Sequence, residues 1–201
     1  MNSTAKIWIF TLVMIITAVV LLWIWQSTDK PDYPEISSPR PFLGTQDASI
    51  VVEEFSDFQC PSCKLADSLI KEIMNTFGDR VVFYYKHFPL SSIHPFAVRA
   101  ALAVECSNDQ GKFWEYHNKL FENQPRFSEN DLINYASELN LNKENFSACL
   151  QSRAKQEVVK NDLREGNSRK LNATPTFFVN GEQIEDWTKL KDIIQGKLLG
   201  V

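Results

Sequence analysis

The longest apolar segment of the chain runs from Ile7 to Trp25 and is interrupted only by two threonines. Its 19 residues could span the hydrocarbon core of a bilayer, which is about 30 Å thick. The alternative is a cleavable signal peptide, whose apolar core would be about 7–15 residues and would end in a small-x-small cleavage site. No such site follows the segment. We therefore expect residues 1–26 to form a short cytoplasmic N-terminus and a retained transmembrane anchor.

The charges around this segment predict its orientation. Lys6 and the amino terminus precede it, whereas the residues directly after it carry a net negative charge. The positive-inside rule then leaves the N-terminus in the cytoplasm and places the rest of the chain outside. Residues 27–42 contain four prolines among polar residues and indicate an extended linker. Residues 43–201 are enough for one domain with its own core.

Beyond the linker, strand-like and helix-like patterns follow one another. A β-branched run at residues 49–55 predicts a buried strand, and apolar residues at helical spacing predict a helix over residues 64–77. A second strand is expected at residues 80–88. A long helical stretch follows, with helices expected at 95–107, 110–123, from Ser128 to about 139, 143–151 and 153–170.

The end of the chain returns to strands. Residues 174–179 predict a strand, Asn180-Gly181 is a strong two-residue hairpin signal, and residues 182–185 predict the returning strand. A final helix is expected at residues 188–199. The order β-α-β, helical block, α, β-β-α predicts an α/β thioredoxin-like fold with a helical insertion at about residues 92–152.

The sequence Cys60-Pro61-Ser62-Cys63 lies where the first strand gives way to the first helix of the domain. A thiol at a helix N-terminus faces free N–H groups that favour an anion, so its pKa falls below the free value of about 8.5. Pro61 suits the first helical turn because it lacks an N–H group. The pattern therefore predicts a dithiol–disulfide redox centre. A zinc site would need two further ligands, and the remaining cysteines and histidines are scattered.

Three segments together resemble a known family. They are residues 52–63 around the C-x-x-C, Gly111-Lys112-Phe113-Trp114, and residues 173–181, which read ATPTFFVNG. On these motifs, residues 41–201 resemble the DsbA-like thiol–disulfide oxidoreductases of the thioredoxin superfamily, here in a membrane-anchored form. The resemblance implies an enzyme with no cofactor other than its own redox-active disulfide.

The resemblance also implies roles for individual residues. Cys60 would be the nucleophile and Cys63 the thiol that resolves the mixed disulfide. Glu54 would be a buried acid that exchanges protons with Cys63, since strand alternation places it with apolar neighbours. The alternative for Glu54 is a surface charge. Glu53 points to the other side of the strand and is expected to be solvated.

Pro175 matches the cis-proline that faces the C-x-x-C in this family, and Thr174 before it would present its backbone to an extended substrate. Pro61 and Ser62 would lie beside the same substrate. An ordinary trans proline at a strand start is the alternative for Pro175.

Cys106 and Cys149 both fall on the apolar faces of their predicted helices. In an exported domain, two inward-pointing cysteines predict a structural disulfide. Two buried free thiols that act as small hydrophobic side chains are the alternative.

The most favoured function is an extracytoplasmic enzyme that introduces disulfides into reduced, exported proteins and is reoxidised by a membrane quinone-linked thiol oxidase. Ser62 stands where oxidising relatives often carry a histidine, which weakens the case for strong oxidising power. The alternatives are a reductase or isomerase fed by a transmembrane electron carrier, and a metal chaperone using Cys60 and Cys63 as soft ligands. The net charge of −4, with no basic cluster, argues against nucleic acid as a partner.

Overall fold

The computed structural model describes residues 3–27 and 39–200, which divide into two units with a boundary between Asp32 and Tyr33. The first unit contains helix α1 (Ser3–Ser27), whose side chains from residue 8 to residue 22 are exposed. Within the described part of the chain, no helix is long and apolar enough to cross a membrane. The structure therefore does not support the anchor predicted over residues 1–26. Most of the predicted linker, residues 28–38, lies outside the described residues.

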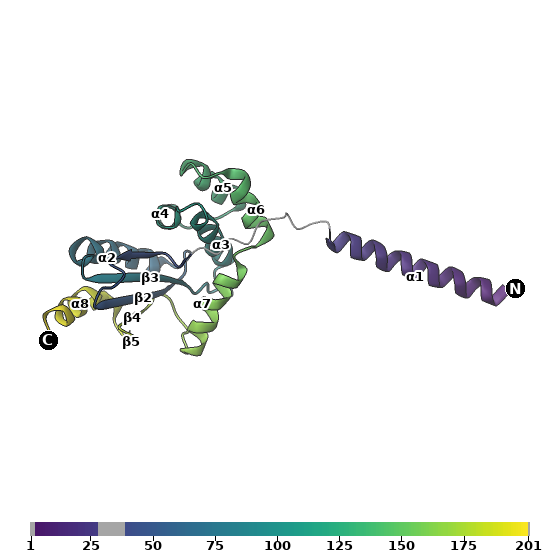
Figure 1. Cartoon of the computed structure of the whole chain (residues 1–201). Helices are drawn as coiled ribbons and strands as arrows, with labels where there is room; N and C mark the ends of the chain where they lie inside the picture. Colours follow the sequence, from purple (N-terminus) through teal and green to yellow (C-terminus); the bar gives the residue numbers. More distant parts are fainter. Residues whose placement is uncertain (1–2, 28–38, 201) are drawn as a thin grey trace. The chain divides into compact units, whose positions relative to one another are not determined.

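The second unit is built on a five-stranded sheet with the order β1-β3-β2-β4-β5 (Figure 1). The two central strands, β2 and β3, are parallel, and the other pairs are antiparallel. The strands are β1 (Phe42–Gly44), β2 (Ile50–Ser56), β3 (Val81–His87), β4 (Thr176–Val179) and β5 (Glu182–Ile184). The parallel pair is connected by helix α2 (Pro61–Phe77), as the β-α-β pattern of the sequence predicts.

Strand β1 was not predicted. It occupies Phe42–Gly44, at the junction between the expected linker and the expected domain, and pairs with β3. Arg40, just before it, bonds to Asp162 and donates to the Tyr85 carbonyl oxygen at 3.0 Å. The last residues assigned to the linker are therefore part of the domain, because this side chain and this strand fix them to the sheet.

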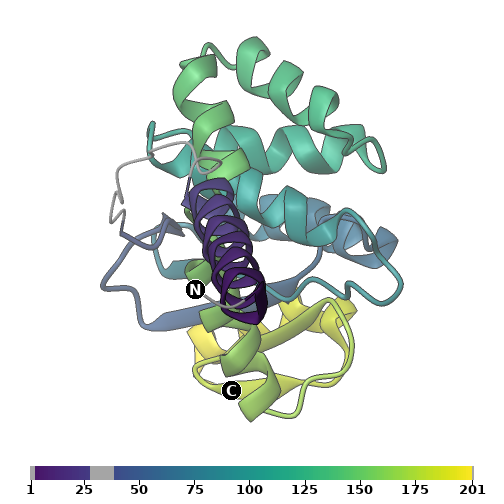
Figure 2. The ribbon, with the colours of Figure 1, turned by 90° about the vertical axis from the view of Figure 1, so that its right-hand side faces the viewer.

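The remaining helices fall into two groups. The helices of the insertion lie together on one side of the domain, and the C-terminal elements lie on the other (Figures 1 and 2). The helices of the insertion are α3 (Ala97–Asn108), α4 (Phe113–Asn123), α5 (Glu129–Glu138) and α6 (Lys143–Ser152). The C-terminal elements are α7 (Gln156–Ser168), η1 (Trp187–Lys189) and α8 (Leu190–Leu199). The predicted α/β thioredoxin-like fold with a helical insertion is confirmed.

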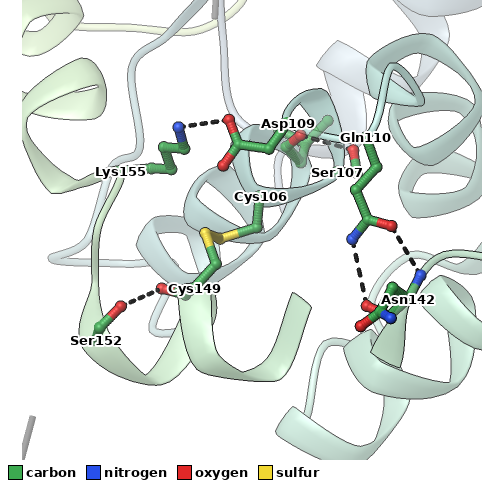
Figure 3. The surroundings of a disulfide bond; sticks show 9 residues. Cys106, Ser107, Asp109, Gln110, Asn142, Cys149, Ser152 and Lys155 are labelled. Atoms are coloured by element: carbon green, nitrogen blue, oxygen red, sulfur yellow. Dashed lines mark hydrogen bonds and ion pairs between the residues drawn. A yellow bond between two sulfur atoms is a disulfide. The ribbon is translucent and has the colours of Figure 1, made fainter. Parts of the chain in front are cut away.

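A disulfide between Cys106 and Cys149 links α3 to α6 inside the insertion. Both residues are fully buried, and their Cα atoms are 5.8 Å apart. Figure 3 shows the bond with a buried ion pair beside it, in which Lys155 Nζ lies 2.6 Å from Asp109 Oδ1. The sequence predicted this pairing of cysteines, and the structure contains it.

A group of charged side chains covers the aromatic cluster of Phe55, Phe88 and Phe178. Lys86 Nζ lies 2.5 Å from Glu53 Oε1 and 2.6 Å from Glu165 Oε1, and Arg169 contacts both acids. The prediction that Glu53 is solvated is wrong. Glu53 does lie on the opposite face of β2 from Glu54. Its carboxylate is nevertheless covered by two cations, Lys86 from β3 and Arg169 from the end of α7.

Candidate active site

The two cysteines of the C-x-x-C are placed by the end of β2 and the start of α2. Cys60 is the N-cap residue of α2, in an extended conformation, and Pro61 occupies the first helical turn. Both thiols are free. Cys63 lies one turn further on and is completely buried, whereas Pro61 and Ser62 are exposed. Cys60 is buried too but is 8% exposed against 0% for Cys63, so Cys60 is the outer of the two, with the two intervening residues facing solvent.

The environment of Cys60 favours its thiolate. A hydrogen bond from the Cys63 thiol is the main cause, and it lowers the pKa of Cys60 to about 5 against the opposing effect of burial. The backbone N–H groups of Ser62 and Cys63, at the free helix N-terminus, act in the same direction. Ser62 therefore contributes to the thiolate through its backbone.

Cys63 has the opposite chemistry. Burial raises its pKa well above the usual value, and the hydrogen bond to Cys60 and the negative charges of Glu54 and Cys60 add to this effect. A buried thiolate at Cys63 is costly, because it loses water and lies near the negative charges of Glu54 and Cys60. As a leaving group, this sulfur needs a proton donor.

Glu54 lies beneath the pair on β2, opposite Tyr85 of β3 and Phe177 of β4. Burial raises its pKa to about 8, and the charges of Asp67 and Cys60 act in the same direction. Its Oε1 atom has no hydrogen-bond partner among the described residues. Glu54 is thus a buried acid that is protonated at neutral pH.

Thr174 and Pro175 face the pair from the turn before β4. The Thr174–Pro175 peptide bond is cis, and the Cys60 thiol donates to the Thr174 carbonyl oxygen at 3.4 Å. Both residues are half-buried. The structure therefore brings Cys60, Cys63, Glu54, Thr174 and Pro175 together, with Pro61 and Ser62 at the surface of the same site. Cys106 and Cys149 lie apart from it, in the insertion.

Three residues that the sequence did not single out also touch this site. Asp57, His94 and Gln124 hold the segment between β2 and α2 by hydrogen bonds. His94 was counted in the sequence only among the scattered histidines. Only the proximity of Asp57 to the C-x-x-C could have drawn attention to it, because His94 and Gln124 reach the site from distant parts of the sequence.

The two buried histidines, His87 and His117, belong to the aromatic core next to the site. Burial lowers the pKa of His117 to about 3, and its ring packs edge-on against Tyr85 and Phe58. His87 lies 2.9 Å from Glu105 through its Nε2 atom. Across the described residues, no three His, Cys, Asp or Glu side chains are grouped so that they could hold a metal ion.

A family model described as thioredoxin matches residues 37–196. The chain belongs to the thioredoxin family. Sequence relatives include the Na(+)/H(+) antiporters NhaA 1 of Salinispora arenicola, 34% identical over 153 residues, and of Mycolicibacterium vanbaalenii, 38% identical over 140 residues. The matches cover 76% and 69% of this chain but only 22% and 23% of those proteins. The chain therefore spans less than a quarter of the length of these relatives.

Solved structures show the same fold. The oxidised form of BdbD from Bacillus subtilis is 28% identical, with a TM-score of 0.71 over 83% of this chain and 99% of BdbD. The thiol–disulfide exchange protein α-DsbA2 from Wolbachia pipientis is 16% identical, with a TM-score of 0.68 over 78% and 86%. The catalytic domain of Proteus mirabilis ScsC is 21% identical, with a TM-score of 0.66 over 81% and 91%. The expected similarity to DsbA-like proteins is confirmed.

Proposed function

We propose that this member of the thioredoxin family is an extracytoplasmic thiol–disulfide oxidoreductase that introduces disulfides into reduced, exported proteins. The observation that carries the proposal is the split between the two thiols, with the pKa of Cys60 lowered to about 5 and that of Cys63 raised. At pH 7, the lowered pKa of Cys60 favours the dithiol form over the disulfide, because only the reduced protein carries this stabilised thiolate. An enzyme whose dithiol form is the more stable one tends to accept electrons from its substrate, and it therefore acts as an oxidant.

The first chemical step transfers the disulfide. A thiolate of the substrate attacks Cys60 Sγ of the Cys60–Cys63 disulfide and forms a mixed disulfide, while the electron pair of the broken bond goes to Cys63 Sγ. Cys63 is a poor leaving group because of its raised pKa. Protonated Glu54 supplies the proton that Cys63 needs, and Glu54 becomes a carboxylate.

The second step releases the product. A second thiolate of the substrate attacks the substrate's own sulfur in the mixed disulfide, and Cys60 leaves as the stable thiolate. The substrate has then lost two electrons and gained a disulfide, and the enzyme holds a dithiol. Thr174 would bind the extended substrate by its backbone during both steps. A membrane quinone-linked thiol oxidase is the partner proposed to remove the two electrons.

Two observations support an oxidising compartment. The Cys106–Cys149 disulfide is of the kind that persists outside the reducing cytosol. The apolar segment at residues 7–25 is the sequence feature that would direct the domain across a membrane. Its role as a membrane anchor stays a prediction. Protease added to intact cells should release a fragment beginning near residues 30–40, and complete protection of the chain would contradict export.

The reduction potential of the Cys60–Cys63 pair tests the direction of electron flow. A potential between those of protein disulfide isomerase and DsbA, about −180 and −120 mV, would support the oxidase. A value near that of thioredoxin, about −270 mV, would instead support the reductase. In a second measurement, the Cys60 thiolate of a Cys63→Ser variant should attack a peptide that carries an activated disulfide, release the activating thiol and remain joined to the peptide, because Cys63 is no longer there to displace the peptide from Cys60.

A further inference from the structure

The segment 57–60 connects β2 to α2. The backbone of Asp57 in this segment forms hydrogen bonds with the backbone of Cys60 and with the sulfur atom of Cys63. The Asp57 carbonyl oxygen accepts from the Cys60 N–H group at 3.0 Å. The Asp57 N–H group donates to Cys63 Sγ at 3.5 Å. A displacement of Asp57 would therefore move a partner of each cysteine. The geometry of the redox pair depends on what holds this segment in place.

His94 holds the segment through the side chain of Asp57. The Asp57 carboxyl group is fully buried, and its Oδ1 atom accepts from the Gln59 N–H group at 2.7 Å. Its Oδ2 atom accepts from the Leu90 N–H group at 2.8 Å and lies 2.8 Å from His94 Nδ1. Because Oδ2 is an acceptor, the Nδ1–H group of His94 is the donor in this contact. His94 lies after β3, at the start of the helical insertion.

Gln124, at the C-terminal end of α4, also holds this segment. Gln124 follows α4 directly, and its Nε2 group donates to the Phe58 carbonyl oxygen at 2.6 Å and to the Cys60 carbonyl oxygen at 3.0 Å. A third contact comes from the Phe96 N–H group, which donates to Gln59 Oε1 at 2.5 Å. All three contacts come from residues 92–152.

We propose that the helical insertion is part of the redox machinery, with His94 and Gln124 as positioning residues that set the reactivity of the Cys60–Cys63 pair. The proposal rests on the proposed function, because it concerns the same thiols. The Cys60 thiolate is stabilised by N–H groups at the start of α2, and this stabilisation requires that they stay aimed at the sulfur. Gln124 bonds to the carbonyl oxygens of Phe58 and Cys60 and so fixes the backbone on which Cys60 is carried.

The test compares Gln124→Leu and His94→Leu with a matched control, Gln110→Leu. Gln110 lies in the same insertion, and its side chain makes two hydrogen bonds to the backbone of Asn142, at 3.2 and 2.7 Å, near the structural disulfide (Figure 3). The readouts are the thiolate absorbance of Cys60 against pH and the equilibrium of the pair with glutathione. The free energy of unfolding is measured in parallel.

Each of the two leucine variants at His94 and Gln124 should raise the pKa of Cys60 by about 0.5 to 1, the equivalent of about one hydrogen bond. The equilibrium constant with glutathione should shift about three- to tenfold towards the disulfide form. Gln110→Leu should lower stability by a similar amount and leave both readouts unchanged. His94→Asn keeps a donor at the position of Nδ1 and should restore the pKa of Cys60 to near the wild-type value.

The possible failures are distinguishable. If the wild-type protein does not exchange disulfides with glutathione, the proposed function is wrong. If the wild type is active but the His94 and Gln124 variants change only stability, as Gln110→Leu does, the positioning role is overturned. If His94→Asn behaves like His94→Leu, the contact to Asp57 is not the cause and the role of His94 is overturned.

Discussion

The two cysteine pairs of this domain lie in contrasting surroundings. Cys106 and Cys149 face each other from two helices inside the insertion, fully buried and already bonded. Cys60 and Cys63 share one helix start, and their pKa values are moved in opposite directions. The structural pair is surrounded by packed side chains and a buried ion pair. The redox pair is surrounded by the N–H groups at the start of α2, the protonated Glu54 and the carbonyl oxygen of Thr174. The difference shows that reactivity here comes from the groups around the sulfur atoms.

Replacing one cysteine of each pair gives the largest expected contrast. Cys60→Ala should abolish disulfide exchange, because Cys63 is completely buried and Cys106 and Cys149 are bonded to each other. Cys149→Ala should retain exchange at the temperature where it is folded. The measurement is oxidation of a reduced peptide by the oxidised protein. Residual exchange in Cys60→Ala would show that another thiol is the nucleophile.

The structural pair should matter for stability instead. Joint replacement of Cys106 and Cys149 by alanine opens a loop with a sequence separation of 43 residues. In the chain-entropy model this costs about 4 kcal/mol of the free energy of unfolding. Denaturant titration of the variant and of the wild type measures the loss. A cost below about 1 kcal/mol would mean that packing of α3 and α6 alone holds the insertion together.

Alkylation of the reduced redox pair should be strongly asymmetric. At pH 6, Cys60 is mostly thiolate and Cys63 is almost entirely thiol, although a low pKa also makes each thiolate a weaker nucleophile. Both effects together predict a preference for Cys60 of about tenfold to a hundredfold. Peptide mapping after short exposure to iodoacetamide measures it, with the bonded Cys106 and Cys149 as internal controls. Equal labelling of Cys60 and Cys63 would contradict the inner and outer roles.

Glu54 should affect the chemistry of the redox pair and, because it is buried, the pH dependence of stability as well. Its pKa is raised from 4.5 to about 8 on folding, so its contribution is present below pH 4.5 and is lost as the pH rises towards 8. Relative to wild type, the reduced Glu54→Gln variant should therefore gain about 2 kcal/mol between pH 5 and pH 7. Its turnover should fall by about tenfold or more, since Cys63 loses its proton donor.

Stability measurements at both pH values, with denaturant, check the first expectation for Glu54→Gln. Stopped-flow kinetics with a reduced peptide check the second. A variant whose stability parallels that of the wild type from pH 5 to pH 7 would show that Glu54 is not buried as a neutral acid.

The sequence predicted the elements whose signals are local. The β-branched run and the apolar spacing after it predicted β2 and α2 to within a few residues, because burial repeats with the period of each element. Strand β1 was missed because three residues beside several prolines carry too little pattern. It forms because β3 offers a free edge, which is a long-range property.

For the active site, the C-x-x-C at a helix start and the ATPTFFVNG segment were sufficient to indicate six of its residues, and the strand before the C-x-x-C added Glu54. His94 and Gln124 could not be predicted, because a turn histidine and a helix-end glutamine are common, and their contacts to Asp57 and Cys60 depend on how the insertion folds back. Glu53 was misread for a similar reason. Its cations, Lys86 and Arg169, come from other elements.

Arg40 has a practical consequence for how the domain can be produced by itself. Its guanidinium group binds Asp162, whose carboxylate is buried and also accepts from the His87 N–H group at 2.8 Å. A recombinant fragment that starts at residue 39 retains this partner, whereas one that starts at Pro41 leaves a buried acid without its cation. The Arg40 side chain is 33% exposed, so its loss should cost less than the loss of one partner from a fully buried ion pair, which is about 3–5 kcal/mol. The fragment that starts at residue 39 should therefore be more soluble and keep longer in storage than the fragment that starts at Pro41, although the two differ by only two residues.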